Sequence, residues 1–299
     1  MMTAVGVCGV GDMGSGLAKN LVKAGFDVSG YDPKPNRAAD MAGFGVERCD
    51  SNAAVGVRSQ AVFVMVMNGD EAREVIFGTD GKGGLASTLP AGGVIILSAT
   101  IKPREASALF TDLPARLHMV DTPVSGGRPG ADGGTLTLMA AGSAAALEAA
   151  RPAMEAVSAT IHIVGDEVGQ GQTVKACLQS LIGSIFTGAF EATGLAAKAG
   201  VPGQVLYDVF STSAAGCGIT NAAVGTVMNR TFQDTGSHIN TMHKDLTISL
   251  DLAMELGVPL FTASTAMQLF QAGRTKYPDG DNQMVARITE DIIGIGLKR

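Results

Sequence analysis

The stretch that most constrains this fold is a glycine-rich segment near the amino terminus. An apolar run, Ala4–Cys8, leads into Gly9-Val-Gly11-Asp-Met-Gly14, and residues 14–24 carry apolar side chains at helical spacing. A second strand-like run, Asp27–Tyr31, is followed by Asp32, 18 residues after Gly14. A strand, a G-x-G-x-x-G turn, a helix and an acid in this order predict a dinucleotide-binding unit. The alternative is a glycine-rich turn in some other α/β protein, and the surrounding pattern argues against it.

Each glycine of this segment has its own predicted task. Gly9 permits the tight turn, and Gly11 lets backbone amides approach a pyrophosphate. Gly14 allows the helix to pack on the strand, with its positive N-terminal end toward the phosphates. Asp12 and Met13 complete the predicted cofactor loop.

The acid after the second strand predicts which dinucleotide binds. Asp32 is expected to accept hydrogen bonds from the ribose hydroxyls and to repel a 2′-phosphate, which favours NAD over NADP. Lys34 and Arg37 follow closely and weaken that preference, so NADP stays open as a cofactor.

The first half of the chain alternates strand-like and helix-like runs. This alternation predicts an α/β fold, a doubly wound, mostly parallel Rossmann sheet, over residues 1–165. The later strands are expected at Ala61–Met67, Val94–Leu97, Leu117–Asp121, Thr135–Ala140 and Thr160–Val164.

The second half has a different character. One helical pattern runs from Gly169 to Ala199, and no convincing strand follows Val164. Residues 166–299 are therefore predicted to be an all-α domain, and its apolar helices are compatible with substrate binding and with burial between subunits.

Composition excludes several classes of protein. With 46% hydrophobic and 17% charged residues among 299, the chain is not disordered. A net charge of −6 without a basic cluster argues against nucleic acid as a partner. No basic leader precedes the first strand, and Ala176–Phe190 is shorter than the roughly 20 apolar residues that span a bilayer. We expect a cytoplasmic protein with no membrane partner.

Cysteines and histidines do not indicate a metal site. The chain has four cysteines, Cys8, Cys49, Cys177 and Cys217, and they form no C-x-x-C pair. They are expected to be buried thiols in a reducing compartment. The four histidines lack metal-ligand spacing, so neither a metal nor a histidine base is assigned.

Two stretches could bind or transform a small substrate. Ser125, Gly126 and Gly127 follow a strand and could present a hydroxyl and amides to a carboxylate, although this stretch taken alone is better explained as a simple Pro/Gly turn. Lys175 and Gln179 lie one helical turn apart in the long helix. Burial would favour the neutral form of the amine, which proton transfer needs, whereas an isolated lysine on a helix usually reaches solvent.

A third stretch lies late in the chain. His243-Lys244-Asp245-Leu246 is expected to begin a helix, from which Lys244 could reach an anionic group. A solvated lysine near a helix start is the alternative.

In this order, the four stretches resemble the β-hydroxyacid dehydrogenase family over nearly the whole chain. The matching pieces are Gly9 to Gly14, Asp121-Thr-Pro-Val-Ser-Gly-Gly127, Gly169-x-Gly171 with Lys175, and Lys244-Asp245-Leu246. The resemblance places the family's catalytic lysine on Lys175 and its substrate-binding Ser-Gly-Gly on residues 125–127. It also implies cofactor contacts from Met67, Asn68, Thr100 and Lys244.

One position departs from the family pattern. Most members carry an asparagine four residues after the catalytic lysine, where this chain has Gln179. The amide is kept but lies one methylene further out, which resembles the L-threonate dehydrogenase branch. The resemblance therefore implies an NAD-dependent dehydrogenase of a small hydroxy acid, with an L-threonate-like substrate, acting as a homodimer or homotetramer. The alternatives are a 3-hydroxyisobutyrate dehydrogenase, a tartronate or succinic semialdehyde reductase, and a non-catalytic NAD(P)-binding sensor.

Overall fold

The computed structural model describes residues 2–79 and 82–299 and divides the chain into two compact units. Their bounds are Met1–Lys175 for unit 1 and Ala176–Arg299 for unit 2. The division falls inside helix α9 (Gln170–Lys198), ten residues after the boundary expected at residue 165. One continuous helix thus contributes its first turns to unit 1 and the rest to unit 2.

Unit 1 is built on a mostly parallel sheet, which confirms the predicted fold class. Among the described residues the nine-stranded sheet has the order β11-β10-β8-β7-β4-β1-β2-β3, with β9 paired to β10. The strands from β3 to β8 are parallel, and β10 runs antiparallel to β8 and parallel to β11. The strands are β1 (Ala4–Cys8), β2 (Asp27–Tyr31), β3 (Glu47–Arg48), β4 (Ala61–Val64), β7 (Val94–Leu97), β8 (His118–Asp121), β9 (Val124–Ser125), β10 (Leu136–Ala141) and β11 (Ser158–Gly165). A separate antiparallel pair joins β5 (Gly78–Thr79) and β6 (Lys82–Gly83).

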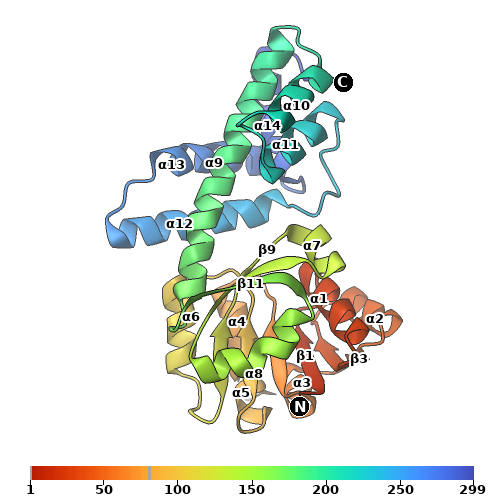
Figure 1. Cartoon of the computed structure of the whole chain (residues 1–299), viewed down its shortest axis with the longest axis vertical. Coiled ribbons are helices and arrows are strands. Elements are labelled where there is room, and N and C mark those ends of the chain that lie inside the picture. The colour runs from red at the N-terminus through yellow and green to blue at the C-terminus, as the bar shows by residue number, and fades with distance from the viewer. Residues whose placement is uncertain (1, 80–81) are drawn as a thin grey trace. The chain divides into compact units, whose positions relative to one another are not determined.

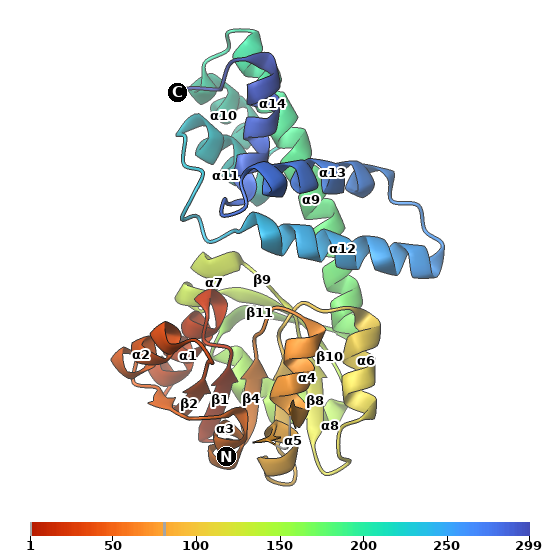
Figure 2. The same ribbon diagram turned by 180° about the vertical axis from the view of Figure 1, so that it is seen from behind.

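Helices cover both faces of this sheet, as Figures 1 and 2 show from opposite sides. One core joins the sheet to α1, α7 and α8, and the other joins it to α3, α4, α5 and α6. Along β4, Ala61 and Phe63 face the first core while Val62 and Val64 face the second. Burial on both sides explains why β4 and β7 are continuous apolar runs. The helices are α1 (Asp12–Lys23), α2 (Pro35–Gly43), α3 (Asn52–Arg58), α4 (Gly69–Phe77), α5 (Leu85–Thr88), α6 (Pro103–Thr111), α7 (Gly127–Gly133) and α8 (Ala144–Glu155).

Among the described residues, the sequence predicted each strand of four or more residues and none of the two-residue strands. β1, β2 and β7 have the predicted bounds. β4 ends at Val64, three residues before the predicted Met67, and the chain then turns toward α4. β3 and β9 were not predicted, because two-residue strands carry no periodic signal.

Unit 2 is all-helical over its described residues, as predicted. Around the second part of α9 it contains α10 (Gly203–Thr212), α11 (Gly218–Met228), α12 (Ile239–Leu256), α13 (Phe261–Lys276), the short 3₁₀ helix η1 (Asn282–Met284) and α14 (Val285–Ile293). Phe186 stacks on Phe190 with ring centroids 5.6 Å apart and meets the edge of Phe270 at 6.4 Å. The predicted start of a helix at His243 was wrong, because α12 already begins at Ile239.

Helix α9 is central to unit 2. It is long and apolar enough, by composition, to cross a membrane, but half of its most apolar window is buried inside the protein. Phe186 and Phe190 belong to the core of unit 2. That burial is typical of the core helix of a folded domain.

The cysteines divide into two kinds, which corrects the expectation that all four are buried. Cys8 and Cys49 are buried in unit 1, whereas Cys177 and Cys217 are exposed. Burial raises the pKa of the Cys8 thiol, and the neighbouring Cys49 adds to the effect.

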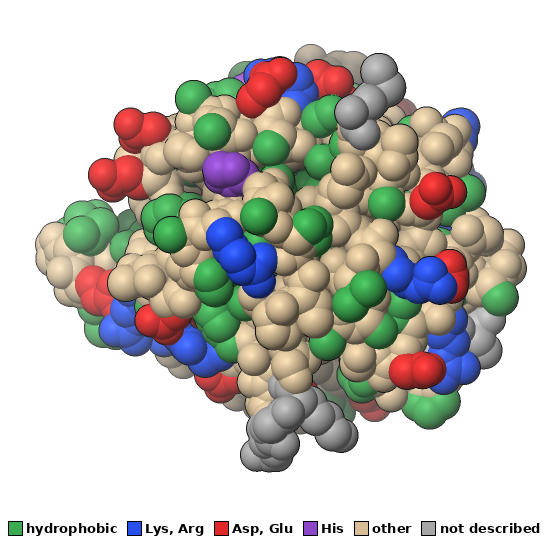
Figure 3. All heavy atoms as spheres, turned by 90° about the horizontal axis from the view of Figure 1, so that it is seen from below, with side chains coloured by type: hydrophobic (Ala, Val, Ile, Leu, Met, Phe, Trp, Pro, Cys, Tyr) green, Lys and Arg blue, Asp and Glu red, His purple; other side chains and the backbone are tan. Residues whose placement is uncertain are grey.

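The space-filling view in Figure 3 shows one face of the molecule. Acidic and basic side chains are interspersed on it, and no basic patch gathers there.

Candidate active site

Two of the three motif glycines are required by packing within unit 1. Gly9 has a φ of +86°, and a Cβ added to it would lie 2.3 Å from the Met65 carbonyl oxygen. A Cβ added to Gly14 would lie 1.9 Å from the carbonyl oxygen of Gly9. Any side chain at either position would therefore displace the strand-to-helix turn.

Gly11 has no such internal reason to be glycine. Its φ of −77° is open to any residue, and a Cβ added to it meets no atom within 4 Å. It directly precedes α1, whose first N–H groups have no acceptor within the helix. Open space beside these donors fits a pyrophosphate, which a side chain at position 11 would obstruct. The loop therefore has the shape that a dinucleotide requires.

Asp32 is held in place at the carboxyl end of β2. Its Oδ2 accepts a hydrogen bond from Val10 N at 2.9 Å, and its Oδ1 accepts one from Lys34 N at 2.9 Å. The acid is thus attached directly to the glycine loop. Arg37, on α2, also contacts the glycine loop, because its Nη2 lies 2.8 Å from Asp12 Oδ1.

The other predicted cofactor contacts of unit 1 follow neighbouring strands. Asn68 caps α4, with its Oδ1 accepting a hydrogen bond from Glu71 N at 2.8 Å. Met67 is half exposed beside it, and its N–H donates to Glu71 Oε2 at 2.9 Å. Thr100 lies in the turn that follows β7. Their contacts with a cofactor remain predictions.

A buried carboxylate organises the start of α9. Asp121, at the end of β8, is fully buried, and its Oδ2 accepts hydrogen bonds from Gly169 N at 2.9 Å and Gln172 N at 3.0 Å. A negative charge at this position also complements the positive end of the helix dipole. Asp121 therefore fixes where the helix that carries Lys175 begins.

Gln172 extends this attachment to a second strand end. Its Nε2 donates to Asp121 Oδ1 at 2.8 Å and to Ala99 O at 2.9 Å, and its Oε1 accepts from Ile101 N at 3.1 Å. The turn that carries Thr100 is therefore fastened to the same cluster as α9.

The environment of Asp121 also affects its ionisation. Burial raises the pKa of Asp121 to about 6, and the surrounding N–H donors, those of Gln172 foremost, counteract this rise. Neither Asp121 nor Gln172 was singled out from the sequence, although both lie within the quoted motifs. Two sequence signals could have identified them. Asp121 is an acid at the end of a predicted strand, and Gln172 lies in the glycine-rich start of a predicted helix.

Lys175 lies in the interior and not at the surface. It is 6% exposed, and its Nζ donates a hydrogen bond to Val124 O at 2.8 Å. Val124 precedes Ser125, so the amine is held beside the predicted substrate segment. The interpretation of Lys175 as a solvent-reaching lysine is therefore wrong.

The segment after Val124 is a turn that only glycine adopts easily. Gly126 and Gly127 have φ values of +132° and +58°. They link β9 to α7, and Ser125 directly precedes them. Within unit 1 the structure thus brings together Lys175, Ser125 and the two glycines, with Asp121 and Gln172 as supports.

A second polar cluster lies in unit 2. Gln179 Nε2 donates a hydrogen bond to Oδ2 of the buried Asp245, and Lys244 Nζ lies 2.9 Å from Asp245 Oδ1. Asp245 was quoted only as part of the last motif, and its partnership with Gln179 was not predicted. Gln179 is thus oriented by a carboxylate from α12.

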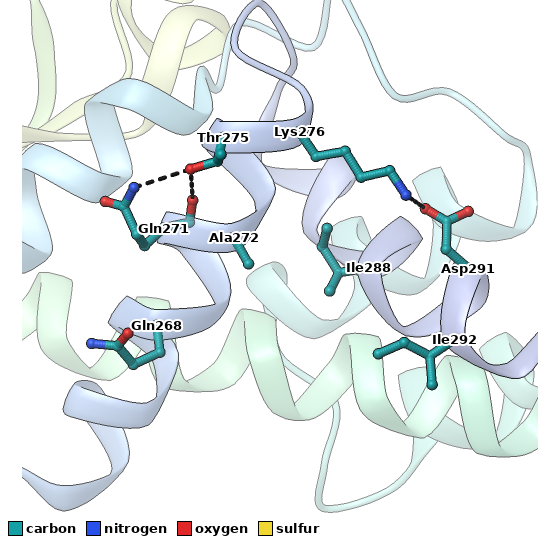
Figure 4. A pocket seen from close by; sticks show the side chains of 8 residues that line it. All are labelled: Gln268, Gln271, Ala272, Thr275, Lys276, Ile288, Asp291 and Ile292. Atoms are coloured by element: carbon teal, nitrogen blue, oxygen red, sulfur yellow. Dashed lines mark hydrogen bonds and ion pairs between the residues drawn. The ribbon is translucent and has the colours of Figure 1, made fainter.

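Unit 2 also contains a cavity with a mixed polar and apolar lining. A groove of about 590 Å³ between α13 and α14 contains Gln268, Ala272, Ile288 and the Lys276–Asp291 ion pair, as Figure 4 shows. None of the predicted site residues lines it. No group of three or more potential metal ligands occurs within residues 2–79 and 82–299.

Comparison with known proteins finds matches to both halves of the chain. Residues 4–165 match the NAD binding domain of 6-phosphogluconate dehydrogenase, and residues 169–289 match the NAD-binding domain of NADP-dependent 3-hydroxyisobutyrate dehydrogenase. An L-threonate dehydrogenase from Escherichia coli O6:H1 is 35% identical over 98% of this chain and 97% of its own length.

Solved structures share the whole fold. The 3-hydroxyisobutyrate dehydrogenase of Salmonella typhimurium superimposes with a TM-score of 0.86 at 32% identity, covering 96% of this chain and 99% of that one. The Mycobacterium tuberculosis 3-hydroxyisobutyrate dehydrogenase, described with L-serine, gives 0.85 at 28% identity, with the same two coverages.

Proposed function

Because this chain belongs to the β-hydroxyacid dehydrogenase family, we propose that it oxidises a small hydroxy acid with Lys175 as the proton carrier. The chain is an NAD(P)-dependent oxidoreductase, and the finer assignment concerns its substrate and its residues. The observation that carries the assignment is the buried amine of Lys175, placed beside Ser125 by its hydrogen bond to Val124 O.

The position of Lys175 suits reversible proton transfer. In oxidation its neutral amine takes the proton of the substrate hydroxyl, and in reduction its ammonium returns a proton to the forming alkoxide. Val124 O can accept an N–H from either form, so this hydrogen bond is compatible with both protonation states of the amine. Bound NAD(P) supplies the redox chemistry, whereas the protein supplies orientation and the proton.

We assign substrate binding to the segment beside Lys175. The Ser125 hydroxyl and the backbone amides of Gly126 and Gly127 bind the carboxylate, since small anions favour such concentrated donors. Gln179 orients the substrate, and Met67, Asn68, Thr100 and Lys244 contact the cofactor. The substrate is L-threonate-like, which rests on Gln179 and on the relatives of that name.

A substrate panel tests the activity. L-Threonate, 3-hydroxyisobutyrate, D-glycerate and succinic semialdehyde are each assayed with NAD(H) and NADP(H). The highest kcat/KM is expected with L-threonate and NAD. Dinucleotide binding without turnover of any of the four would favour a non-catalytic sensor instead.

A glycine substitution tests the cofactor loop separately. Gly11→Ala should weaken NADH binding by at least about tenfold, because the added methyl group occupies the space assigned to the pyrophosphate. Nicotinamide fluorescence measures the affinity. Gly43→Ala is the matched control, since Gly43 is also exposed to open space in unit 1. Equal affinities for the two variants would contradict the assignment of the loop.

The assembly and location are also proposed. We infer a cytoplasmic homodimer or homotetramer, for which the apolar, exposed side chains of unit 2, such as Phe261 and Ile292, provide contact area. Light scattering that gives about one chain mass, 30.4 kDa, would refute the oligomer.

A further inference from the structure

The glycine loop carries an acidic residue that pairs with an arginine on the next helix. Asp12 is the first residue of α1, and Arg37 lies in the first turn of α2. Arg37 Nη2 and Asp12 Oδ1 are 2.8 Å apart, and the two side chains keep 35% and 29% of their exposure. The pair therefore joins the phosphate-binding end of α1 to the helix that follows Asp32.

The two residues of this pair lie on the helices before and after Asp32 in the chain, and Asp32 is the acid predicted to bind the ribose. Asp32 is fastened to Val10 and Lys34 by backbone hydrogen bonds, so its carboxylate marks the position of the adenosine ribose. A 2′-phosphate on that ribose would need a cation nearby. Arginine is well suited to this task, because its planar fork matches phosphate oxygens. Arg37 lies five residues after Asp32 and is the arginine nearest to it in the sequence.

The charge of Arg37 is already balanced by a carboxylate. An acid in the first turn of α1 gains from the helix dipole, but it would also repel a bound phosphate. The ion pair offsets that repulsion and directs one end of the guanidinium toward Asp12. A 2′-phosphate would have to compete with Asp12 for Arg37 and at the same time face Asp32.

We propose that Asp12 is a specificity-determining residue, which selects NAD(H) over NADP(H) by holding Arg37 away from a 2′-phosphate. The proposal rests on dinucleotide binding to unit 1 and deepens it. Asp32 supplies repulsion at the 2′ position, and Asp12 removes the cation that would offset it. Discrimination thus depends on two acids that act differently.

Equilibrium binding to the full chain tests this without any need for turnover. The Kd values of NADH and NADPH are measured by nicotinamide fluorescence for the natural protein and for Asp12→Asn, which keeps the side-chain size and removes the charge. We expect the ratio of the NADPH Kd to the NADH Kd to fall by about fivefold, the scale of one exposed ion pair. The effect should shrink as salt is added, because both charges are partly exposed.

Two further variants show whether Arg37 is responsible. Adding Arg37→Gln to Asp12→Asn should restore the original ratio. Asp70→Asn is the matched control, because Asp70 is an exposed acid in the first turn of α4. It makes the same change in net charge and should leave the ratio within about twofold.

Each outcome has a separate meaning. If the natural protein binds neither dinucleotide, the specificity role and the proposed function are both refuted. If NADH binds but Asp12→Asn leaves the ratio within about twofold, only the role of Asp12 is refuted. If the fall in the ratio of the NADPH Kd to the NADH Kd persists after Arg37→Gln is added, or if Asp70→Asn also produces it, the fall arises from net charge alone. Either result would also refute the role of Asp12.

Discussion

Lys175 and Lys244 differ in the partner that each one faces. Lys175, in unit 1, donates to a neutral carbonyl, whereas Lys244, in unit 2, lies against the carboxylate of Asp245. A carbonyl accepts an N–H from a charged or a neutral amine alike, but a carboxylate favours the charged form. The sequence marked both lysines as candidates, and the structure gives them different partners, a backbone carbonyl for Lys175 and a carboxylate for Lys244.

The largest expected effect is the loss of turnover when the amine of Lys175 is removed. Lys175→Met keeps the length of the side chain but removes the amine, so kcat should fall by about 10²- to 10⁴-fold. Steady-state kinetics with the preferred hydroxy acid gives the value. Lys198→Met is a matched control, since Lys198 is also on α9 and also donates to a carbonyl, Ile293 O, at 3.0 Å. A loss below about tenfold at Lys175 would end its role as proton carrier.

A change at Asp121, which accepts hydrogen bonds from the start of α9, should have the next largest effect on turnover. Asp121→Asn replaces one acceptor of Gln172 by a donor, and we expect kcat to fall by about tenfold, because Lys175 follows Gln172 by three residues. An unchanged kcat would show that Lys175 is positioned without Asp121.

The same variant gives a pH signature. The folded-state pKa of Asp121 is raised from 3.8 to about 6, so this group favours the folded state most below pH 4, and that advantage is lost as pH rises through 6. The stability difference between the natural protein and Asp121→Asn should therefore shrink by up to about 3 kcal/mol between pH 4 and pH 7. Urea unfolding across this range measures it, with the exposed acid variant Asp50→Asn as control. A constant difference would contradict the raised pKa.

Lys244 should show the smallest effect on turnover and a visible effect on stability. Lys244→Met leaves the buried Asp245 without this cation, which should lower the free energy of unfolding by about 1–3 kcal/mol. Denaturant unfolding followed in unit 2 measures the loss. A kcat loss as large as that of Lys175→Met would abolish the distinction between the two lysines.

The sequence predicted most of the fold for two reasons. Apolar side chains recur at the spacing of strands and helices, and dinucleotide binding requires particular glycines and an acid. Glycine spacing with a following acid identified the dinucleotide loop, and apolar runs identified β1 and β7. The family and its NAD(P) cofactor are confirmed, whereas the roles of individual residues stay predictions.

What the sequence did not reveal depends on contacts between distant segments. Asp121 and Gln172 are 51 positions apart, and Gln179 and Asp245 are 66 apart. No periodic pattern encodes such pairs. The Asp12–Arg37 ion pair was missed for the same reason, although the sequence placed Arg37 near the cofactor.

Because two of the cysteines are exposed and two are buried, the natural protein can be labelled selectively at its thiols. A thiol reagent reacts through the thiolate, which is scarce at Cys8 because burial raises its pKa. Under native conditions such a reagent would modify Cys177 and Cys217, both in unit 2, and spare Cys8 and Cys49. Cys177 follows Lys175 by two residues, so a fluorophore there would label the exposed side of the first turns of α9 without any engineered attachment point.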